Sequence, residues 1–378
     1  MSNKIPFNKP YMVGKELWYI AKAHHAGHLA GAGEFTLRCQ RWLENTTGAR
    51  KALLTHSCTA ALEMAAVISD IQPGDEIIMP SYTFVSTASA FVMRGGVPVF
   101  VDVREDTLNI DERLIEGAIT PRTKAIVPVH YAGVGCEMDV IMAIAEKYNL
   151  LVIEDAAQGV MASYKGRALG TIGHLGAVSF HETKNIISGE GGALMINDQK
   201  LVDRAEVAWE KGTNRRKFFR GEVDKYTWEG LGSSYLPSEL VAAFLYAQME
   251  EAEYITQQRL ELWNTYHAVF AGAEVRGKLR RPIISEECLH NAHMYYVLMP
   301  SEEKRNTTIK ILKEYGVHSV FHYIPLHSSP AGMKYGRGDG VFHVTDAVSE
   351  RIVRLPMWVG LKEVQGEVIA SVLEIADA

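Results

Sequence analysis

Short apolar runs alternate with amphipathic stretches over about residues 50–200 of the chain. The apolar runs have the length of strands buried on both faces, and they lie at residues 52–54, 76–79, 97–103, 125–129, 150–153 and 177–180. Between them, helix-periodic stretches lie at residues 59–69, 86–94, 110–118 and 139–148. This alternation predicts an α/β domain with a mostly parallel sheet between helices. Because such sheets bind ligands at the carboxyl ends of their strands, residues directly after each run are candidates for function.

The second half of the chain has a different pattern. A basic and aromatic segment at residues 214–221 interrupts the alternation and reads as a loop. Residues 238–270 are helix-periodic and rich in Glu and Gln, which predicts a long connecting helix. The pieces after it predict a smaller α+β unit, and they lie at residues 294–299, 307–315, 317–323 and 364–376. We therefore predict a large domain at residues 1–250 and a small C-terminal domain at residues 251–378.

Composition narrows the class of protein. The 378 residues are 47% hydrophobic and 22% charged, as in ordinary globular proteins, and no apolar run is long enough for a membrane span. The net charge of -6 offers no basic field for nucleic acid. The four cysteines form no CxxC pair, which is typical of reduced thiols and predicts no metal site. The first thirty residues lack the apolar core of a signal peptide. We expect a cytoplasmic protein that binds neither nucleic acid nor membrane.

Asp155 and Lys184 follow two successive apolar runs and come to the same predicted sheet edge. A carboxylate and a lysine in these places suit pyridoxal phosphate (PLP), because the lysine amine forms an imine with the cofactor aldehyde and the carboxylate pairs with the pyridinium nitrogen. Burial lowers the pKa of such a lysine, and only its neutral amine is nucleophilic. The alternative is that each residue is simply a solvated loop residue.

Ser57, Cys58 and Thr59 lie between an apolar run and a predicted helix. Free backbone N–H groups and the positive helix end make such a position an anion site. A plain helix N-cap explains the same residues without any ligand.

Four strings carry a resemblance to a known family: SCTAAL at 57–62, PSYTF at 80–84, EDAAQ at 154–158 and SFHETKN at 179–185. In order and spacing they resemble the sugar-nucleotide aminotransferases, PLP enzymes of fold type I with the aspartate aminotransferase fold. The resemblance extends from IPF at 5–7 to LPM at 355–357. It implies that Lys184 is the catalytic lysine, that Asp155 contacts the ring nitrogen, and that the enzyme is a homodimer or a dimer of dimers with active sites at the subunit interface.

The resemblance also assigns the remaining cofactor positions. It places Ser57, Cys58, Thr59 and the Ser179 hydroxyl at the cofactor phosphate. It places Phe84 on the face of the ring and Gln158 near the ring hydroxyl. Without the resemblance, an aromatic after a strand such as Phe84 is more often part of the core. Gln158 would then be interpreted as a surface glutamine.

Two positions depart from the family pattern. Where members commonly have an Asn that reaches the phosphate in the neighbouring subunit, this chain has Ser234, and the nearby Arg position is Leu236. His181 lies where the family varies, and its side chain either shares in proton transfer or only packs. Some relatives have a histidine in place of the catalytic lysine, and these carry out dehydration. Because this chain has Lys184 at that position, the resemblance favours transamination.

Two further segments are candidates for substrate contacts. The string HYIPLH at 322–327 resembles family segments that close over the active site, which implies that His322, Tyr323 and His327 bind sugar. Arg215 and Arg216 lie in the basic segment and have the guanidinium geometry that matches phosphate. Structural histidines and a solvated charged loop are the alternatives.

Within the family, the strings KGTNRR at 211–216 and SSYLP at 233–237 are similar to members that act at C4 of a dTDP-linked keto sugar. The expected reaction moves the amino group of L-glutamate to C4 of dTDP-4-keto-6-deoxy-D-glucose. One alternative is a 3-keto or differently configured nucleotide sugar. Another is a non-catalytic PLP-binding regulatory module.

Overall fold

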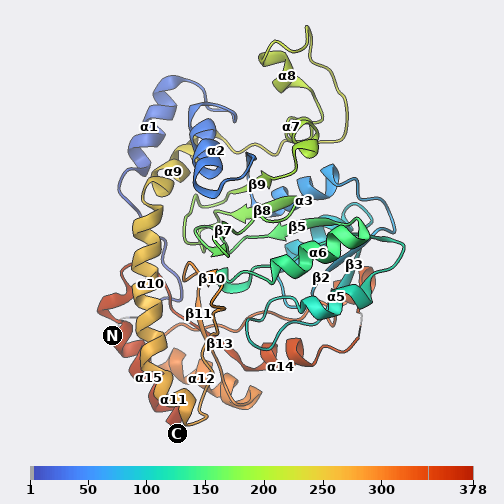
Figure 1. Ribbon diagram of the computed structural model, residues 1–378. Coiled ribbons are helices and arrows are strands. Elements are labelled where there is room, and N and C mark those ends of the chain that lie inside the picture. Colours follow the sequence, from blue (N-terminus) through green and yellow to red (C-terminus); the bar gives the residue numbers. More distant parts are fainter. Residues whose placement is uncertain (1–3, 339, 378) are drawn as a thin grey trace.

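An eight-stranded sheet forms the centre of the computed structural model, which describes residues 4–338 and 340–377 (Figure 1). In spatial order its strands are β1 (Lys51–Thr55), β9 (Gly192–Ile196), β8 (Leu175–Ser179), β5 (Leu151–Asp155), β4 (Thr123–Ile126), β2 (Glu76–Pro80), β3 (Val97–Val101) and β12 (Arg337–Gly338). Strand β9 is antiparallel to both neighbours, and every other pair in this sheet is parallel. The predicted mostly parallel α/β sheet is confirmed.

The strands are apolar throughout because both faces of the sheet are covered. Successive residues point to opposite faces, so Leu53 joins one hydrophobic core while Ala52 and Leu54 join the other. One face is covered by α3 (Cys58–Ile68), α4 (Val85–Val92) and α7 (Val202–Trp209). The other face is covered by α2 (Glu34–Thr47), α5 (Glu112–Ala118), α6 (Met138–Tyr148) and α9 (Glu239–Glu250).

The connection to the C-terminal part consists of two helices, where the sequence pattern predicted one. Helix α9 ends at Glu250 and α10 (Ala252–Val269) begins two residues later, because Glu251 leaves the helical region at φ -110° and ψ 15°. Together they form the long yellow column of Figure 1, against which α1 (Glu16–Ala26) packs at its upper end.

The C-terminal part has its own core around a two-stranded antiparallel sheet. Strand β11 (Tyr295–Leu298) pairs with β13 (Ile352–Leu355), and buried side chains of α10, α12 (Glu302–Glu314) and α15 (Gln365–Asp377) pack on it. Helix α14 (His343–Arg351) leads into β13 and α11 (Ala271–Val275) follows α10. The predicted piece at 317–323 is irregular, with single bridges from Val317 to Ile5 and from Val320 to Arg354.

Several segments cross between the large and the C-terminal parts. After α13 (Pro330–Tyr335), the chain returns to the main sheet as β12 and pairs with β3. Strand β10 (Cys288–Leu289) pairs with β6 (Ser163–Tyr164), which in turn pairs with β7 (Arg167–Ala168). These exchanges hold the two parts side by side around the edge of the main sheet.

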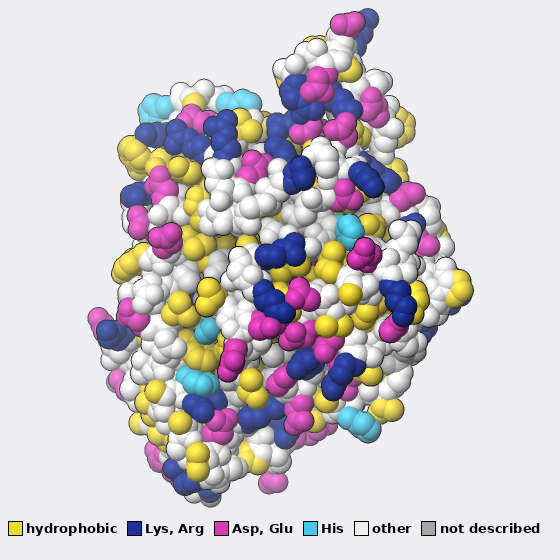
Figure 2. All heavy atoms as spheres, in the orientation of Figure 1, with side chains coloured by type: hydrophobic (Ala, Val, Ile, Leu, Met, Phe, Trp, Pro, Cys, Tyr) yellow, Lys and Arg dark blue, Asp and Glu magenta, His cyan; other side chains and the backbone are white. Residues whose placement is uncertain are grey.

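An arm projects from the body at the top of Figure 1. It comprises residues 210–235 and contains the short helix α8 (Arg215–Phe219). Figure 2 shows Lys and Arg side chains over this arm, with Asp and Glu side chains among them. Across residues 4–338 and 340–377, no helix combines the length and apolar character needed to cross a bilayer.

Candidate active site

The strand register brings the predicted site residues to one edge of the main sheet. Thr55 at the end of β1 is paired with Gly192, which is in turn paired with Ser179 at the end of β8. Asp155 ends the neighbouring strand β5 and is paired with Ala177. The segments that follow β1, β5 and β8 therefore meet at the ligand-binding edge.

A cavity of about 450 Å³ lies at this edge, within the range of small-molecule sites. Its walls include most of the residues predicted from the sequence, namely Ser57, Cys58, Thr59, Phe84, Asp155, Gln158, Ser179, Lys184, His322 and Tyr323. The same cavity is lined by His181. In the described residues, no group of three or more His, Cys, Asp or Glu side chains is arranged to hold a metal ion.

The Asp155 carboxylate is held in a fixed orientation inside the cavity. Its side chain is buried, with the residue only 5% exposed. The Thr87 hydroxyl donates to Oδ2 at 2.7 Å and the Ala157 N–H donates to Oδ1 at 3.1 Å. Thr87 is itself paired with Thr83 at 2.8 Å. A carboxylate held in this way presents a steady negative charge to a cationic group in the cavity.

Lys184 lies in the turn after β8, where its N–H donates to the His181 carbonyl at 2.9 Å. The cavity walls desolvate its ammonium, and this lowers the pKa of Lys184 below its usual value. The Asp155 carboxylate opposes that shift, and the Arg354 cation adds to it. A lowered pKa increases the fraction of neutral amine, the form that attacks a carbonyl and accepts a proton.

The start of α3 forms the anion-binding end of the cavity. Ser57 is the N-cap of this helix, and its Oγ accepts from the Ala60 N–H at 3.0 Å. The N–H groups of Cys58 and Thr59 open the helix, where they have no intrahelical acceptor. A Cβ added at Gly192 would lie 2.4 Å from the Cys58 nitrogen, so only glycine lets β9 approach this closely. The N-cap and the anion site are thus two properties of one loop.

Another part of the cavity wall consists of Gln158, Tyr323 and His322. The Gln158 Oε1 accepts from the Ala132 N–H at 2.6 Å, and Nε2 donates to the Tyr323 hydroxyl at 3.1 Å. His322 Nδ1 is 2.9 Å from the Tyr131 hydroxyl. Burial lowers the pKa of His322 well below its usual value and raises that of Tyr323, so both side chains are neutral.

The model of the DegT/DnrJ/EryC1/StrS aminotransferase family matches residues 10–374. The chain belongs to this family. The spore coat polysaccharide biosynthesis protein SpsC of Bacillus subtilis is 34% identical over 368 residues, covering 95% of this chain and 93% of that protein. GDP-perosamine synthase of Caulobacter vibrioides is 30% identical over 375 residues, covering 98% of each chain.

Solved structures agree with this assignment. The PLP form of the sugar aminotransferase Spr1654 of Streptococcus pneumoniae superposes with a TM-score of 0.90 at 25% identity, covering 99% of each chain. Its PMP form superposes with a TM-score of 0.91, covering 99% of this chain and 98% of that one. Fold type I, the PLP cofactor and the sugar aminotransferase activity expected from the sequence are therefore confirmed. The alternative of a non-catalytic regulatory module is set aside.

The residues of this aminotransferase fit the cofactor. An amine, a fixed carboxylate and a helix start with free N–H groups line one cavity, and they match an aldehyde, a pyridinium and a phosphate. When bound, PLP supplies the aldehyde and a ring that takes up the electron pair left by a broken C–H bond. In this arrangement Lys184 would be the group that moves the proton, and Asp155 the group that would keep the ring nitrogen charged.

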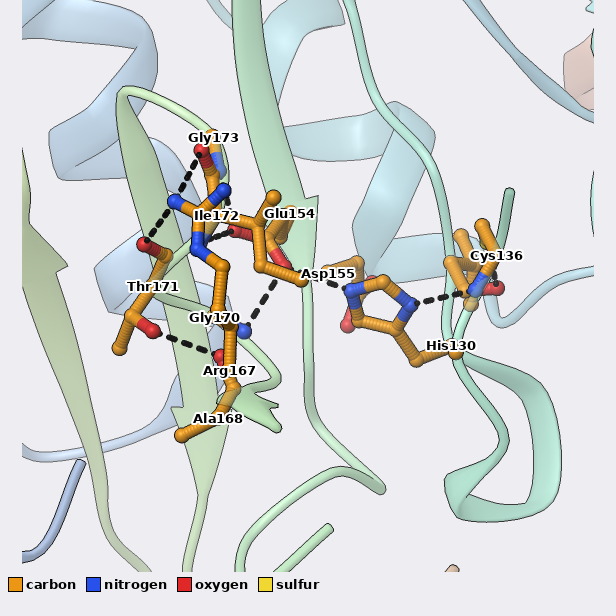
Figure 3. Close-up of polar contacts among 12 residues, drawn as sticks. His130, Cys136, Glu154, Asp155, Arg167, Ala168, Gly170, Thr171, Ile172 and Gly173 are labelled. Atoms are coloured by element: carbon orange, nitrogen blue, oxygen red, sulfur yellow. Dashed lines mark hydrogen bonds and ion pairs between the residues drawn. The ribbon is translucent and has the colours of Figure 1, made fainter. Parts of the chain in front are cut away.

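A buried polar network stands directly behind Asp155 (Figure 3). The fully buried Glu154 carboxylate accepts from His130 Nε2 at 2.8 Å and from the Gly170, Ile172 and Gly173 N–H groups at 2.8, 2.6 and 2.6 Å. His130 Nδ1 accepts from the Cys136 N–H at 3.2 Å, which leaves the ring proton on Nε2. This network fixes the end of β5 and thereby the position of Asp155.

Four predicted residues lie away from this chain's own cavity. His327 Nδ1 contacts the Ser81 Oγ at 2.7 Å, and its ring stacks on Phe342. The other three are on the projecting arm: the guanidinium carbons of Arg215 and Arg216 lie 5.1 Å from the Phe219 and Trp209 ring centroids, and Ser234 is exposed. Phe84 does line the cavity, with its residue 56% exposed at the mouth.

Several residues that line the cavity or support Asp155 are not predicted by the sequence pattern. From the sequence, His293 reads as an ordinary surface or packing histidine, because no third ligand accompanies it at metal spacing. In the structure it lines the cavity, and its Nδ1 donates to the Asn185 Oδ1 at 3.0 Å. Thr87 was overlooked because a threonine inside a helix gives no signal of its own. Arg354 was overlooked because it lies within an apolar strand. A charged residue between the apolar residues of this strand was the signal from which Arg354 could have been found.

Proposed function

We propose that this aminotransferase transfers the amino group of L-glutamate to C4 of dTDP-4-keto-6-deoxy-D-glucose, giving dTDP-4-amino-4,6-dideoxy-D-galactose and 2-oxoglutarate. The observation that carries amino transfer is the desolvated Lys184 amine in one cavity with the fixed Asp155 carboxylate. The sugar assignment is supported by the sequence at 211–237, in the arm and directly after it, which resembles dTDP-4-amino-4,6-dideoxygalactose transaminase of enterobacterial common antigen synthesis.

The chain's residues have distinct tasks in this reaction. Lys184 accepts the proton from the Cα of glutamate in the first half and returns a proton to C4 of the sugar in the second. Asp155 holds the charge of the ring nitrogen, and the N–H groups of Cys58 and Thr59 hold the phosphate. Because each product leaves before the next substrate binds, the rate law is ping-pong.

The mouth of the cavity suits a hexose. Phe84 is exposed there, and its ring centroid lies 6.3 Å from that of Tyr323. Phe84 keeps its predicted place on the face of the cofactor ring, and the apolar edge that it forms with Tyr323 is open to one face of the sugar. His322 and Tyr323 are neutral and offer donors and acceptors to sugar hydroxyls. His327 is held by Ser81 and acts on the sugar only through the neighbouring segment.

The arm supports a dimer in which one chain completes the cavity of the other. Large apolar side chains are exposed along it, and they include Phe219, Trp228 and Leu231. Ser234, Arg215 and Arg216 would then reach the cofactor and nucleotide phosphates of the partner. The assembly is a homodimer or a dimer of dimers. The four free thiols support a reducing, cytoplasmic location.

One spectroscopic experiment tests this function. The absorbance spectrum of the holoenzyme is recorded alone, after L-glutamate, and after dTDP-4-keto-6-deoxyglucose. We expect the visible cofactor band to disappear with glutamate and return with the keto sugar, and NMR of the product to show a galacto-configured amine at C4. A band that glutamate removes but this sugar does not restore would refute the sugar assignment.

A second candidate has one observation in its favour. GDP-perosamine synthase is similar along the whole chain, so a GDP-linked sugar is the alternative nucleotide substrate. A 3-keto or differently configured sugar is distinguished in the same way, by which keto sugar restores the band.

A further inference from the structure

We infer that a second cavity, at the opposite edge of the main sheet from Lys184, binds a small diphosphate anion, and that the bound anion stabilises the turn that holds Glu154. The site lies outside the proposed function, and its chemistry does not depend on which sugar accepts the amine.

The strand register brings the lining residues of this second cavity to one edge of the sheet. Strand β9 ends where β1 and β8 begin, because Ile196 is paired with both Lys51 and Leu175. The residues directly outside these three strand ends are Arg50, His174 and Asn197. They line a cavity of about 310 Å³. The catalytic cavity lies at the other ends of the same five-residue strands, so the two sites are roughly 15 Å apart.

Two guanidinium groups of the second cavity lack an anion. Arg50 and Arg167 are exposed, and neither forms an ion pair with any residue that the structure describes. Arg50 Nη1 donates to the Gln199 Oε1 at 3.2 Å, and Arg167 Nη2 donates only to backbone carbonyls. Because a guanidinium has five N–H donors, most of them remain available to a solute.

The charges of the lining leave an excess of positive charge. Asp198 is the one carboxylate among the residues that line this cavity, and it caps a single helical turn by accepting from the Lys200 N–H at 2.9 Å. Two cations therefore face one carboxylate that already has a partner. An anion that enters the cavity is attracted by this potential.

His174 adds a neutral donor to the two cations. Its Nδ1 accepts from the Val152 N–H at 3.0 Å, so the proton of the neutral ring is on Nε2. Burial lowers the pKa of His174, which favours this neutral form. Its Nε2–H has no acceptor among the described residues. The cavity thus combines two open guanidinium groups with one open imidazole N–H.

This donor set favours a diphosphate over a carboxylate. Arg50 precedes β1 and Arg167 lies in β7, so the two guanidinium groups come from different elements. A planar carboxylate is satisfied by one guanidinium, whereas the oxygens of two linked phosphoryl groups are numerous enough to bind both and His174 as well. The volume also exceeds what a single phosphate needs.

The turn at residues 170–173 lies between this cavity and Glu154 (Figure 3). Its N–H groups donate to the Glu154 carboxylate. Its carbonyls accept from Arg167 Nη2 at 3.3 and 3.4 Å and from Asn197 Nδ2 at 3.0 and 2.9 Å. An anion on the free Nε and Nη1 donors of Arg167 orders the guanidinium against the turn. Since Glu154 precedes Asp155, the anion stabilises the support of the catalytic carboxylate.

Calorimetric titration of the PLP-loaded enzyme with inorganic pyrophosphate tests the site, because the cofactor then fills the anion site at α3. We expect Arg50→Gln and Arg167→Gln each to raise the Kd about tenfold, as for loss of one charge-assisted hydrogen-bonding group. Arg204→Gln is the matched control, because it removes the same charge from an exposed pair with Asp70 and should leave the Kd unchanged. Equal losses in Arg50→Gln and Arg204→Gln would overturn the inference.

The active site is the alternative location for a diphosphate, since we assign Arg216 to the nucleotide there. Arg216→Gln should leave the Arg50-dependent binding of pyrophosphate unchanged. If Arg216→Gln raises the Kd and Arg50→Gln does not, the anion binds at the active site and the inference fails, while the proposed amino transfer stands. Arg50→Gln should react with L-glutamate at the wild-type rate, because Arg50 is remote from Lys184.

Hydrogen exchange locates the bound anion and tests its link to Glu154. With pyrophosphate at ten times its Kd, the amides of residues 170–173 should exchange about tenfold more slowly in wild type and in Arg204→Gln. At the same concentration their exchange in Arg50→Gln should slow only about twofold. Slower exchange confined to α3 or to the arm would contradict the proposed location. Binding that leaves the 170–173 amides unchanged would overturn the link to Glu154.

Three probes distinguish the possible sources of the anion. Orthophosphate, pyrophosphate and dTDP are each titrated into wild type and Arg50→Gln, and only the Arg50-dependent binding is counted. Tighter binding of dTDP than of pyrophosphate would assign the site to a nucleotide, and equal binding would assign it to free pyrophosphate. Orthophosphate that binds as tightly as pyrophosphate would contradict the diphosphate assignment. Absence of Arg50-dependent binding for all three would overturn the inference.

Discussion

The cavity wall and the projecting arm differ in how far their functional side chains are buried. In the wall, Asp155 and Gln158 are buried and each is held by hydrogen bonds from the same chain. In the arm, Trp228 is 77% exposed and Phe219 is 67% exposed. One chain therefore fixes the groups that perform the chemistry, and it leaves open the groups that we assign to contacts with a partner chain.

The difference shows how preorganisation is distributed. Groups that act on a developing charge must be in place before the substrate arrives, because reorganising them during the reaction raises the barrier. Groups that complete a nucleotide site after association can be ordered by that association. Substitutions in the two regions should therefore have different consequences.

The largest effect is expected for Lys184→Ala. Without the amine neither proton transfer has a base, so kcat should fall by about 10⁴-fold or more. The fold and the oligomeric state should persist, because Lys184 follows β8 and belongs to none of the hydrophobic cores. Steady-state turnover with light scattering as the folding control measures both. Residual activity above one per cent of wild type would contradict the role of Lys184.

A smaller loss of activity is expected for Asp155→Asn. The amide keeps the shape and can still accept from Thr87, but it carries no charge to hold the proton of the ring nitrogen. We expect kcat to fall about 10² to 10³-fold, the range for removal of one preorganised electrostatic group. Thr87→Val is the companion variant, since it leaves the carboxylate and removes only one hydrogen bond to it. Wild-type kcat in Asp155→Asn would exclude the contact with the ring nitrogen.

For Glu154→Gln we expect the main effect on stability. An amide nitrogen in place of one carboxylate oxygen would face N–H donors of His130 and the 170–173 turn. We expect the free energy of unfolding to fall by about 3 kcal/mol, as for other broken buried charged networks. Urea denaturation measures it. Glu222→Gln, in an exposed pair on the arm, is the control and should leave the midpoint unchanged.

The smallest effect on the folded chain is expected for Phe219→Ala in the arm. Its exposed ring contributes little to the core, so the melting temperature at high dilution should stay within about 1 °C of wild type. If the arm contacts a partner, the dimer dissociation constant measured by sedimentation should rise about tenfold. A dimer of unchanged affinity would place the interface elsewhere.

Much of the fold could be predicted from the sequence because a sheet covered on both faces needs continuous apolar strands. The predicted runs at 52–54 and 76–79 lie within β1 and β2, and the run at 150–153 overlaps β5. The direction of β9 could not be predicted, since an apolar run has the same composition in either orientation. The two-residue strand β12 gave no signal, because it has neither length nor apolar character.

The site could be predicted at positions where a residue type has few roles other than the catalytic one. Asp155 ends β5 and Lys184 lies shortly after β8. Because neighbouring parallel strands end at the same edge of the sheet, their spacing along the sequence was enough to predict that the two side chains lie close together. The hydrogen bond from Thr87 and the place of His293 depend on tertiary packing that no spacing encodes. The break at Glu251 likewise follows from packing, since helix periodicity continues through it.

The position of β12 has a consequence for biosynthesis. β3 lies at residues 97–101, but its outer neighbour is made from residues 337–338. On the ribosome, β3 therefore remains an open strand edge until nearly nine-tenths of the protein has been translated, and open edges invite pairing with other chains. The nascent polypeptide is exposed to misassembly for most of its synthesis, and closure of the sheet is one of the last events in its maturation.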